Sequence, residues 1–407
     1  MCFFVKVGKN GWRVLSNSGW SINWIGNQLE YCCGFRETFT CKLGLCGLND
    51  IFVSTKPKVM PNYLKALLLA LVFVVSGCKD DKEEDKVFVD PAEAVERNLF
   101  LLEDCAAVLH DGDFAQLVKL LTNDTETDGV DFTWLEEVLD ILSEQYFSDY
   151  PFYDNNEINF QNYEGVYTWD ASSDQFTKVA SPGKMEVLVS GSYGSSSNDF
   201  RLVLEGLSET TARIDGEQFQ VPTGLTSSVY WKNSRIAGLT IDNLTIDPTG
   251  NTTLPVSFRA EVYTAPFTHT FQVSRSDSKN YQARFEMENN GGCTYELFVS
   301  AVSNVSTYEN FELEENLVSA SGYFDAQGLK YQFAMNGAIM QLDDPTNEEI
   351  NEYIDVDLYS GGEKIGELFL NADDQVMLVS NDGTQTNAED LLMPHLEAIE
   401  NLFSDFE

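Results

Sequence analysis

The chain has 407 residues, enough for one large folded domain or two smaller ones. Its 65 acidic residues outnumber its 25 basic residues, which gives a formal net charge of −40 at pH 7. This charge repels nucleic-acid phosphates and anionic membrane surfaces, so it excludes both as electrostatic partners. Any membrane attachment must come from another source.

Residues 1–59 differ in composition from the rest of the chain. They hold five of the eight cysteines and seven Lys/Arg against three Asp/Glu, whereas the chain from Cys78 onward holds 17 Lys/Arg and 62 Asp/Glu. We interpret residues 1–59 as upstream sequence read as protein, not folded, with Met60 as the true start. The alternative is a cysteine-rich, metal-binding module. However, Cys32 and Cys33 are adjacent, and the segment has no histidine and no C-x-x-C unit. Its cysteines therefore lack the ligand spacing of a zinc site.

Residues 60–77 have the pattern of a bacterial lipoprotein signal peptide. Lys65 precedes an apolar run of about ten residues, which is too short to span a bilayer as a helix but suits an export signal. The run ends in the peptidase motif Val75, Ser76, Gly77 and Cys78. The small residues before the cut admit an extended backbone to a peptidase, and the Cys78 thiol accepts a diacylglycerol. The sequence therefore predicts lipidation at Cys78, with palmitate incorporation, as the attachment to the membrane.

Residues 78–89 form an acidic segment with no apolar side chain until Val87, so we expect a solvated tether. Its start, Lys79, Asp80 and Asp81, resembles the surface-export signal of Bacteroidetes lipoproteins over about ten residues. The resemblance implies lipid anchoring in the outer membrane, facing outside the cell. The alternative is an ordinary charged spacer on a lipoprotein that faces the periplasm.

Residues 90–151 are predicted to be helical and to pack on a sheet. Asp90 suits an N-cap, Pro91 a first helical position and Glu93 an acidic first turn. Val95, Leu99 and Leu102 begin an apolar stripe at the helical interval. A second helix is expected from Asp113 and a third from Thr133, before Pro151 ends the region.

From residue 159 to 380 the hydrophobic period changes to two, which indicates strands. The clearest case is Tyr281 to Glu288, for which we predict one buried and one solvated face. Short turns between the strands predict antiparallel neighbours. A final helix is expected within 385–407, with Pro394 as a kink or the true start.

The predicted fold class for 90–407 is therefore α+β. N-terminal amphipathic helices and a C-terminal helix cover a large curved antiparallel β-sheet, a meander of about ten or more strands. A closed barrel or two half-domains are alternatives, with a possible break near 247–251. Tyr163–Trp169 and Ile350–Leu370 are also similar to segments of uncharacterised Bacteroidetes surface lipoproteins. These relatives imply no activity.

Catalytic and metal-binding patterns are sparse. His110, His269 and His395 stand far apart in sequence, and we expect each to be structural or exposed. We predict no metal site, no cofactor and no catalytic residue, because no nucleophile elbow, phosphate-binding glycine loop or paired C-x-x-C occurs. Cys105 and Cys293 are able to pair in an oxidising compartment. We nevertheless expect Cys105 to be a buried free thiol, because it falls among the apolar residues of a predicted helix.

Aromatic residues give a further hypothesis. Trp169, Trp231 and Tyr230 are candidates for stacking on a glycan, although core packing explains most such clusters. Three functions stay open. The first, which we favour, is a noncatalytic surface lipoprotein that binds a protein, glycan or other ligand. The second is a carrier of a lipid or hydrophobic ligand in a cavity between sheet and helices. The third is a hydrolase with two carboxyls about 5 to 10 Å apart.

Overall fold

The computed structural model describes two short segments near the N-terminus and most of the chain from Asp90. The described ranges are 2–6, 12–16, 90–122, 133–147, 153–154, 157–193, 196–214, 216–247, 254–306, 313–342 and 344–403. Cys2–Lys6 (β1) and Trp12–Ser16 (β2) pair as a separate two-stranded sheet. The predicted signal peptide, Cys78 and the tether up to residue 89 lie outside the described residues, so those predictions stay predictions.

The helices lie mainly at the two ends of the described chain. A π-helical turn (Ser143–Phe147) continues α5, and a 3-10 helix (Gly337–Gln341) follows β16. The α-helices are α3 (Pro91–Asp111), α4 (Asp113–Thr122), α5 (Thr133–Leu142), α6 (Phe160–Tyr163), α7 (Leu313–Asn316), α8 (Asn347–Tyr353) and α9 (Ala388–Phe403). Pro394 lies inside α9 and does not start it.

The strands between these helices form one 16-stranded sheet and a small separate pair, β3 (Tyr153–Asp154) with β4 (Glu157–Ile158). The sheet contains β5 (Gly165–Asp170), β6 (Gln175–Val179), β7 (Lys184–Tyr193), β8 (Ser196–Ile214), β9 (Glu217–Trp231), β10 (Ser234–Asp247), β11 (Leu254–Thr264), β12 (Phe267–Arg275), β13 (Asn280–Asn289), β14 (Thr294–Ser303), β15 (Leu317–Ala326), β16 (Leu329–Asn336), β17 (Ile354–Ser360), β18 (Glu363–Leu370), β19 (Val376–Ser380) and β20 (Gln385–Asn387).

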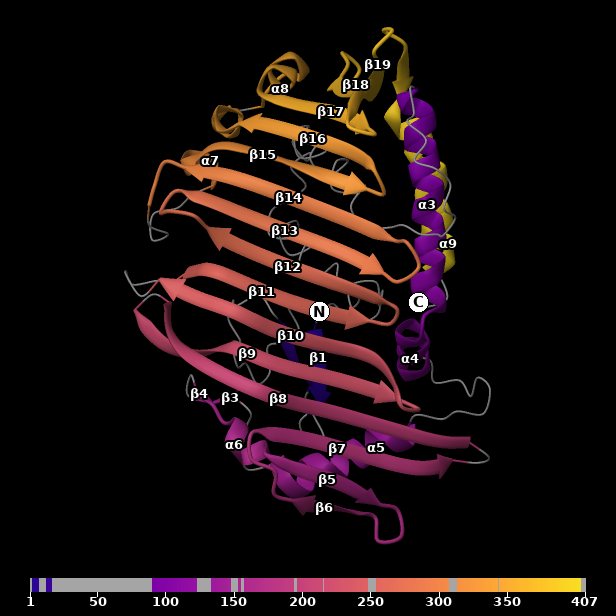
Figure 1. Ribbon diagram of the computed structural model, residues 1–407, viewed down its shortest axis with the longest axis vertical. Coiled ribbons are helices and arrows are strands. Elements are labelled where there is room, and N and C mark those ends of the chain that lie inside the picture. The colour runs from indigo at the N-terminus through magenta and orange to yellow at the C-terminus, as the bar shows by residue number, and fades with distance from the viewer. Residues whose placement is uncertain are drawn as a thin grey trace.

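The predicted α+β class, with a large antiparallel sheet between N-terminal helices and a C-terminal helix, is confirmed (Figure 1). From β7 to β20 each strand pairs with the next, so the sheet is a meander over this range, with β20 at one open edge. The other edge departs from a meander. β5 and β6 form an antiparallel hairpin, but β7 then pairs in parallel with the far side of β5, which leaves β6 at the edge.

Helices pack on one face of this sheet, which we call the apolar face. Figure 1 shows α3 and α9 together beside one end of the upper strands, while α5 lies at β5–β7. The start of α3 reaches β18, where Pro91 lies against Gly366, and its end reaches the β11–β12 turn, where Gly112 meets Ala265. The N-cap is confirmed, since the Asp90 carboxylate accepts a hydrogen bond from the amide of Ala92 (2.9 Å).

The expectation that Cys105 is a free thiol is wrong. Cys105 on α3 and Cys293 in the β13–β14 turn form a disulfide, with Cα atoms 6.6 Å apart and 188 residues between them in sequence. Both residues are fully buried. Nearby, the Asn98 amide donates to the carbonyl of Ala326 (2.9 Å), so α3 is fixed to the sheet by both a covalent and a polar contact. The apolar setting of Cys105 was read correctly, but its partner is brought close only by the tertiary fold.

The proposed break near 247–251 lies outside the described residues except for Asp247. On either side of it, β10 and β11 pair antiparallel within the same sheet. The core is divided in another way, into separate hydrophobic clusters along the sheet. One cluster lies under α3 and α9 and contains Leu99, Leu102, Tyr295 and Phe324. A second lies under α5 and contains Leu135, Val138 and Val187.

Candidate functional site

A continuous row of uncharged side chains crosses the middle of the apolar face. The strand register places its members directly opposite one another from β11 to β16: Phe258, Val273, Ala283, Val299, Gly322 and Phe333. Neighbours in such a row are close enough for their side chains to touch across adjacent strands. The aromatic ring of Phe333 lies over Gly322, where an added Cβ would meet the ring at 2.9 Å.

Part of this row, with its neighbours, is exposed. Phe271 and Val273 are 42% and 38% exposed, whereas Phe267 on the same face of β12 is buried. Ala283 on the next strand is also exposed. The ring centres of Phe271 and Phe285 lie 4.8 Å apart, so the two rings are in contact. We call six residues the apolar patch: the exposed Phe271, Val273 and Ala283 with the half-buried Phe258, Phe285 and Val299.

The patch is exposed because it lies farther along β12 and β13 than the residues that α3 covers. A small cluster reaches it from β9–β11, formed by Leu239, Ile241 and Val262 with Leu225 and Phe258 alongside, and it contains no helical residue. At the covered end of the same strands, Phe267 and Met287 are buried against α3. Among the described residues of β12 and β13, those within about two positions of α3 are therefore buried on the apolar face. Phe271 and Ala283, farther along the same strands, are exposed.

The patch contains no ionisable group, and titratable side chains flank it on the same face of β12. Arg275, two residues beyond Val273, is paired with the Asp247 carboxylate (2.5 Å). His269, two residues from Phe271 on the same face of β12, contacts the hydroxyl of Thr264 through Nε2 (2.9 Å). Burial lowers the pKa of His269 to about 4, because the charged imidazolium loses solvation there. The six patch residues themselves therefore offer only apolar contacts, and the titratable group beside them at the α3 end is uncharged at physiological pH.

The opposite face of the sheet is polar and closely paired. On β13, Arg284 contacts Glu286 and, on the neighbouring strand, Glu296, each at 2.8 Å. Partial burial alone would raise the pKa of Glu296, but hydrogen bonds from Arg284 and Tyr323 hold that pKa below its usual value. The bond to Glu296 raises the pKa of Tyr323 to about 12. These groups stabilise one another and form a solvated surface.

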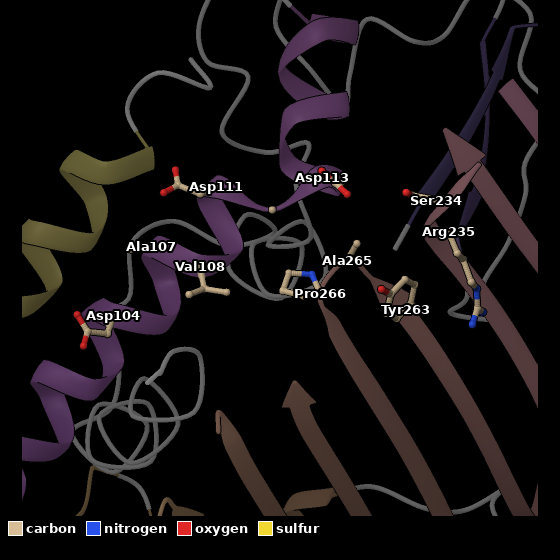
Figure 2. Close-up of a pocket in the computed structure, with 11 residues that line it drawn as sticks. Asp104, Ala107, Val108, Asp111, Asp113, Ser234, Arg235, Tyr263, Ala265 and Pro266 are labelled. Carbon is tan, nitrogen blue, oxygen red and sulfur yellow. The ribbon is translucent and has the colours of Figure 1, made fainter. Parts of the chain in front are cut away.

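An open pocket of about 670 Å³ lies where the end of α3 meets the β9–β10 and β11–β12 turns (Figure 2). Asp111 and Asp113 stand on its helical side, with Tyr263 and Arg235 on its strand side. The Arg235 guanidinium lies 4.9 Å from the centre of the Tyr263 ring, and its buried Nε makes no hydrogen bond to a described residue. The lining mixes charged side chains with apolar ones such as Val108 and Pro266, and contains no histidine or cysteine.

The structure does not bring the three candidate stacking aromatics together. Trp169 and Trp231 are half-buried and pack against the cluster under α5. Tyr230 precedes Trp231 on β9 and therefore points to the opposite face, where the Arg201 guanidinium lies 4.9 Å from its ring centre. A glycan could not stack on all three at once.

The three histidines are also separate. His395 on α9 is buried and contacts the Glu103 carboxylate on α3 (2.5 Å), while His110 contacts its neighbour Asp111 (2.8 Å). No group of three His, Cys, Asp or Glu side chains in the described part of the chain is placed to hold a metal ion. Among the described helices, none combines the length and the apolar character needed to cross a bilayer.

No protein-family model, curated protein or solved structure matches this chain. The feature that sequence reasoning missed is the apolar patch. The sequence signal for it was the alternation along β12, which places Phe267, Phe271 and Val273 on one face. This apolar stretch of the strand is longer than the predicted helices could cover.

Proposed function

We propose that this chain is a lipid-anchored envelope protein that binds a partner noncatalytically at the cell surface. The apolar patch carries the binding part of this proposal. An exposed, contiguous apolar surface costs free energy in a monomer and commonly marks an interaction site. This cost is notable in a chain with 65 acidic residues, which could supply polar side chains at these positions.

The anchoring part rests on residues 60–89 and is supported by two features of the adjoining domain. The first described helix of that domain begins at Pro91, directly after the proposed tether. The Cys105–Cys293 disulfide suits an oxidising compartment such as the bacterial envelope, because cytosolic thiols are kept reduced. Both features are those expected of a domain that folds after export.

Anchoring is tested by exchanging the acylated residue. In a Bacteroidetes host fed with labelled palmitate, we expect the parent chain to incorporate label and to fractionate with membranes. A Cys78→Ser variant should lose the label and move to the soluble fraction. Ser76→Ala is the matched control, because it keeps a small residue before the cut and should be processed normally. An unlabelled parent chain, or a Cys78→Ser variant that stays in the membrane, would refute the anchor.

Surface location is tested separately by protease treatment of intact cells. We expect the parent domain to be cleaved from outside. Joint replacement of Asp80 and Asp81 by Asn should protect it, because the export-like segment loses its acidic character. Joint replacement of Glu84 by Gln and Asp85 by Asn removes the same charge farther from Cys78 and serves as the control. Protection of the parent would argue for the periplasmic side. Equal protection of both variants would mean that export depends on total acidic charge and not on its position beside Cys78.

A further inference from the structure

Helices are the elements that complete the apolar face elsewhere in this molecule. Over β5–β7 and β12–β19, the described segments whose buried apolar side chains pack on this face are mainly α3, α5 and α9. An amphipathic helix suits a sheet face because one apolar stripe buries against it while the other side stays in water. The patch borders this helical layer, farther along β12 and β13 than the part that α3 covers.

The dimensions of the patch fit a further helix beside α3. Along β13, Phe285 and Ala283 lie two and four residues from Met287, which packs in the cluster under α3. These separations are about 7 and 14 Å along a strand. They bracket the distance of about 8–10 Å between the axes of packed helices.

The length of the row also fits. From Phe258 on β11 to Phe333 on β16 the row crosses six strands, or about 24 Å. A helix lying across the strands would cover this distance with about 16 residues. α3 itself crosses the strands in this way, between Gly366 on β18 and the β11–β12 turn.

Charge selects among the possible occupants. A second copy of the chain would bring another net charge of −40 to the contact, so self-association is opposed by repulsion. A helix with a basic polar side would be attracted by the same field, while its apolar stripe meets a patch without ionisable groups.

We propose that the apolar patch is a docking site for a cationic amphipathic helix of a separate protein. The helix lies beside α3 and completes the helical layer. This inference rests on the proposed partner-binding function and specifies the chemistry of the partner. It does not depend on the lipid anchor.

The test uses the full chain carrying Cys78→Ser, so that no acyl group competes for the patch. The probe is a fluorescently labelled 18-residue peptide of leucine and lysine in helical amphipathic order, titrated at moderate salt and followed by anisotropy. A scrambled peptide of the same composition keeps the charge but has no apolar stripe. We expect saturable binding of the amphipathic peptide and at least tenfold weaker binding of the scrambled one.

Two variants on β12 separate the patch from the overall charge. Phe271→Glu and Gln272→Glu each add one negative charge, on the apolar and the polar face respectively. We expect the first to weaken binding tenfold or more and the second to change it less than twofold. If Phe271→Glu loses its native circular dichroism, Ala283→Glu with Gln282→Glu as its control provides the same comparison at an exposed small residue.

Equal binding of the two peptides would overturn the proposal, because charge alone would explain it. Equal effects of the paired variants would overturn it as well. A parent chain that sediments as a dimer, and that Phe271→Glu dissociates, would assign the patch to a second copy. A failed palmitate experiment with a positive peptide result would remove the anchor and leave the docking site in place.

Discussion

The imidazole of His269 lies on the same face of β12 as Phe267 and Phe271, between a covered and an exposed part of the apolar face. From sequence we expected a structural or exposed histidine, and its contact with Thr264 supports a structural role. What the sequence could not supply was the extent of its burial, because the residues around it come from other strands. Val262 on β11 and Met287 on β13 are its registered neighbours.

This burial predicts a pH dependence of stability. The folded-state pKa of His269 is about 4 and its ordinary value is 6.5, so the unfolded chain binds this proton more readily than the folded one. Stability is therefore lost as the pH falls from about 6.5 to about 4, and is unaffected by this group at higher pH. We expect His269 to account for roughly 2 to 3 kcal/mol of this loss, which allows for the partial exposure of its ring.

The measurement is urea unfolding of the parent and of His269→Gln at pH 7 and pH 4. Glutamine keeps a polar group near Thr264 but does not titrate. The variant should lose less stability than the parent between the two pH values, by the amount given above. An identical pH dependence in both proteins would mean that the imidazole is solvated in the folded state.

At the scale of elements, local signals located α3 well. Asp90, Pro91 and Glu93 define its start through hydrogen bonds and backbone geometry confined to one turn, which sequence contains in full. The capping box of α8, in which Thr346 and Glu349 bond reciprocally, carried the same kind of signal and was not singled out. The pairing of Cys105 was misjudged because its partner lies 188 residues away.

This disulfide should contribute strongly to stability. It closes a long loop in the unfolded chain, and both sulfur atoms are buried where α3 meets the β13–β14 turn. We expect a double variant, Cys105→Ala with Cys293→Ala, to lose about 3–5 kcal/mol of unfolding free energy in urea. Cys78→Ala, outside the disulfide, serves as the control. A double variant as stable as the parent would mean that the pair is not oxidised in the native protein.

Strand periodicity was informative about side-chain direction but not about burial. On β13, the apolar positions of the predicted alternation do share one face, yet Met287 is buried while Ala283 is exposed. Alternation depends on the strand alone, whereas burial depends on where α3 and α9 end. The apolar patch arises from that difference.

At the scale of the whole molecule, charge is the dominant feature. Several basic residues of the sheet are engaged by carboxylates, as in Arg259 with Asp242 (2.7 Å) and Lys364 with Asp357 (2.7 Å). Because acidic residues exceed basic ones by 40 in the chain, most carboxylates have no basic partner available. Their mutual repulsion opposes the compact state.

We therefore expect salt to stabilise the protein. Raising NaCl from 20 mM to 500 mM should increase the unfolding free energy by about 1–2 kcal/mol, or a few degrees in Tm, because screening weakens repulsion over the surface. Thermal unfolding at pH 7 followed by circular dichroism measures this effect. The same titration at pH 4, where many carboxylates are protonated, should show a smaller rise. A Tm that falls with salt at pH 7 would mean that the ion pairs outweigh the repulsion.

The sequence by itself determined the fold class, the start of α3 and the alternation of the strands, because these follow from short-range patterns of polarity and backbone preference. It also provides the complete basis for the proposed anchor at Cys78, which is a local motif. Only the tertiary structure decided the disulfide, the separation of the aromatic candidates and the exposure of the apolar patch. Each of these depends on which distant segments pack together, and in particular on how far along β12 and β13 the helical cover extends.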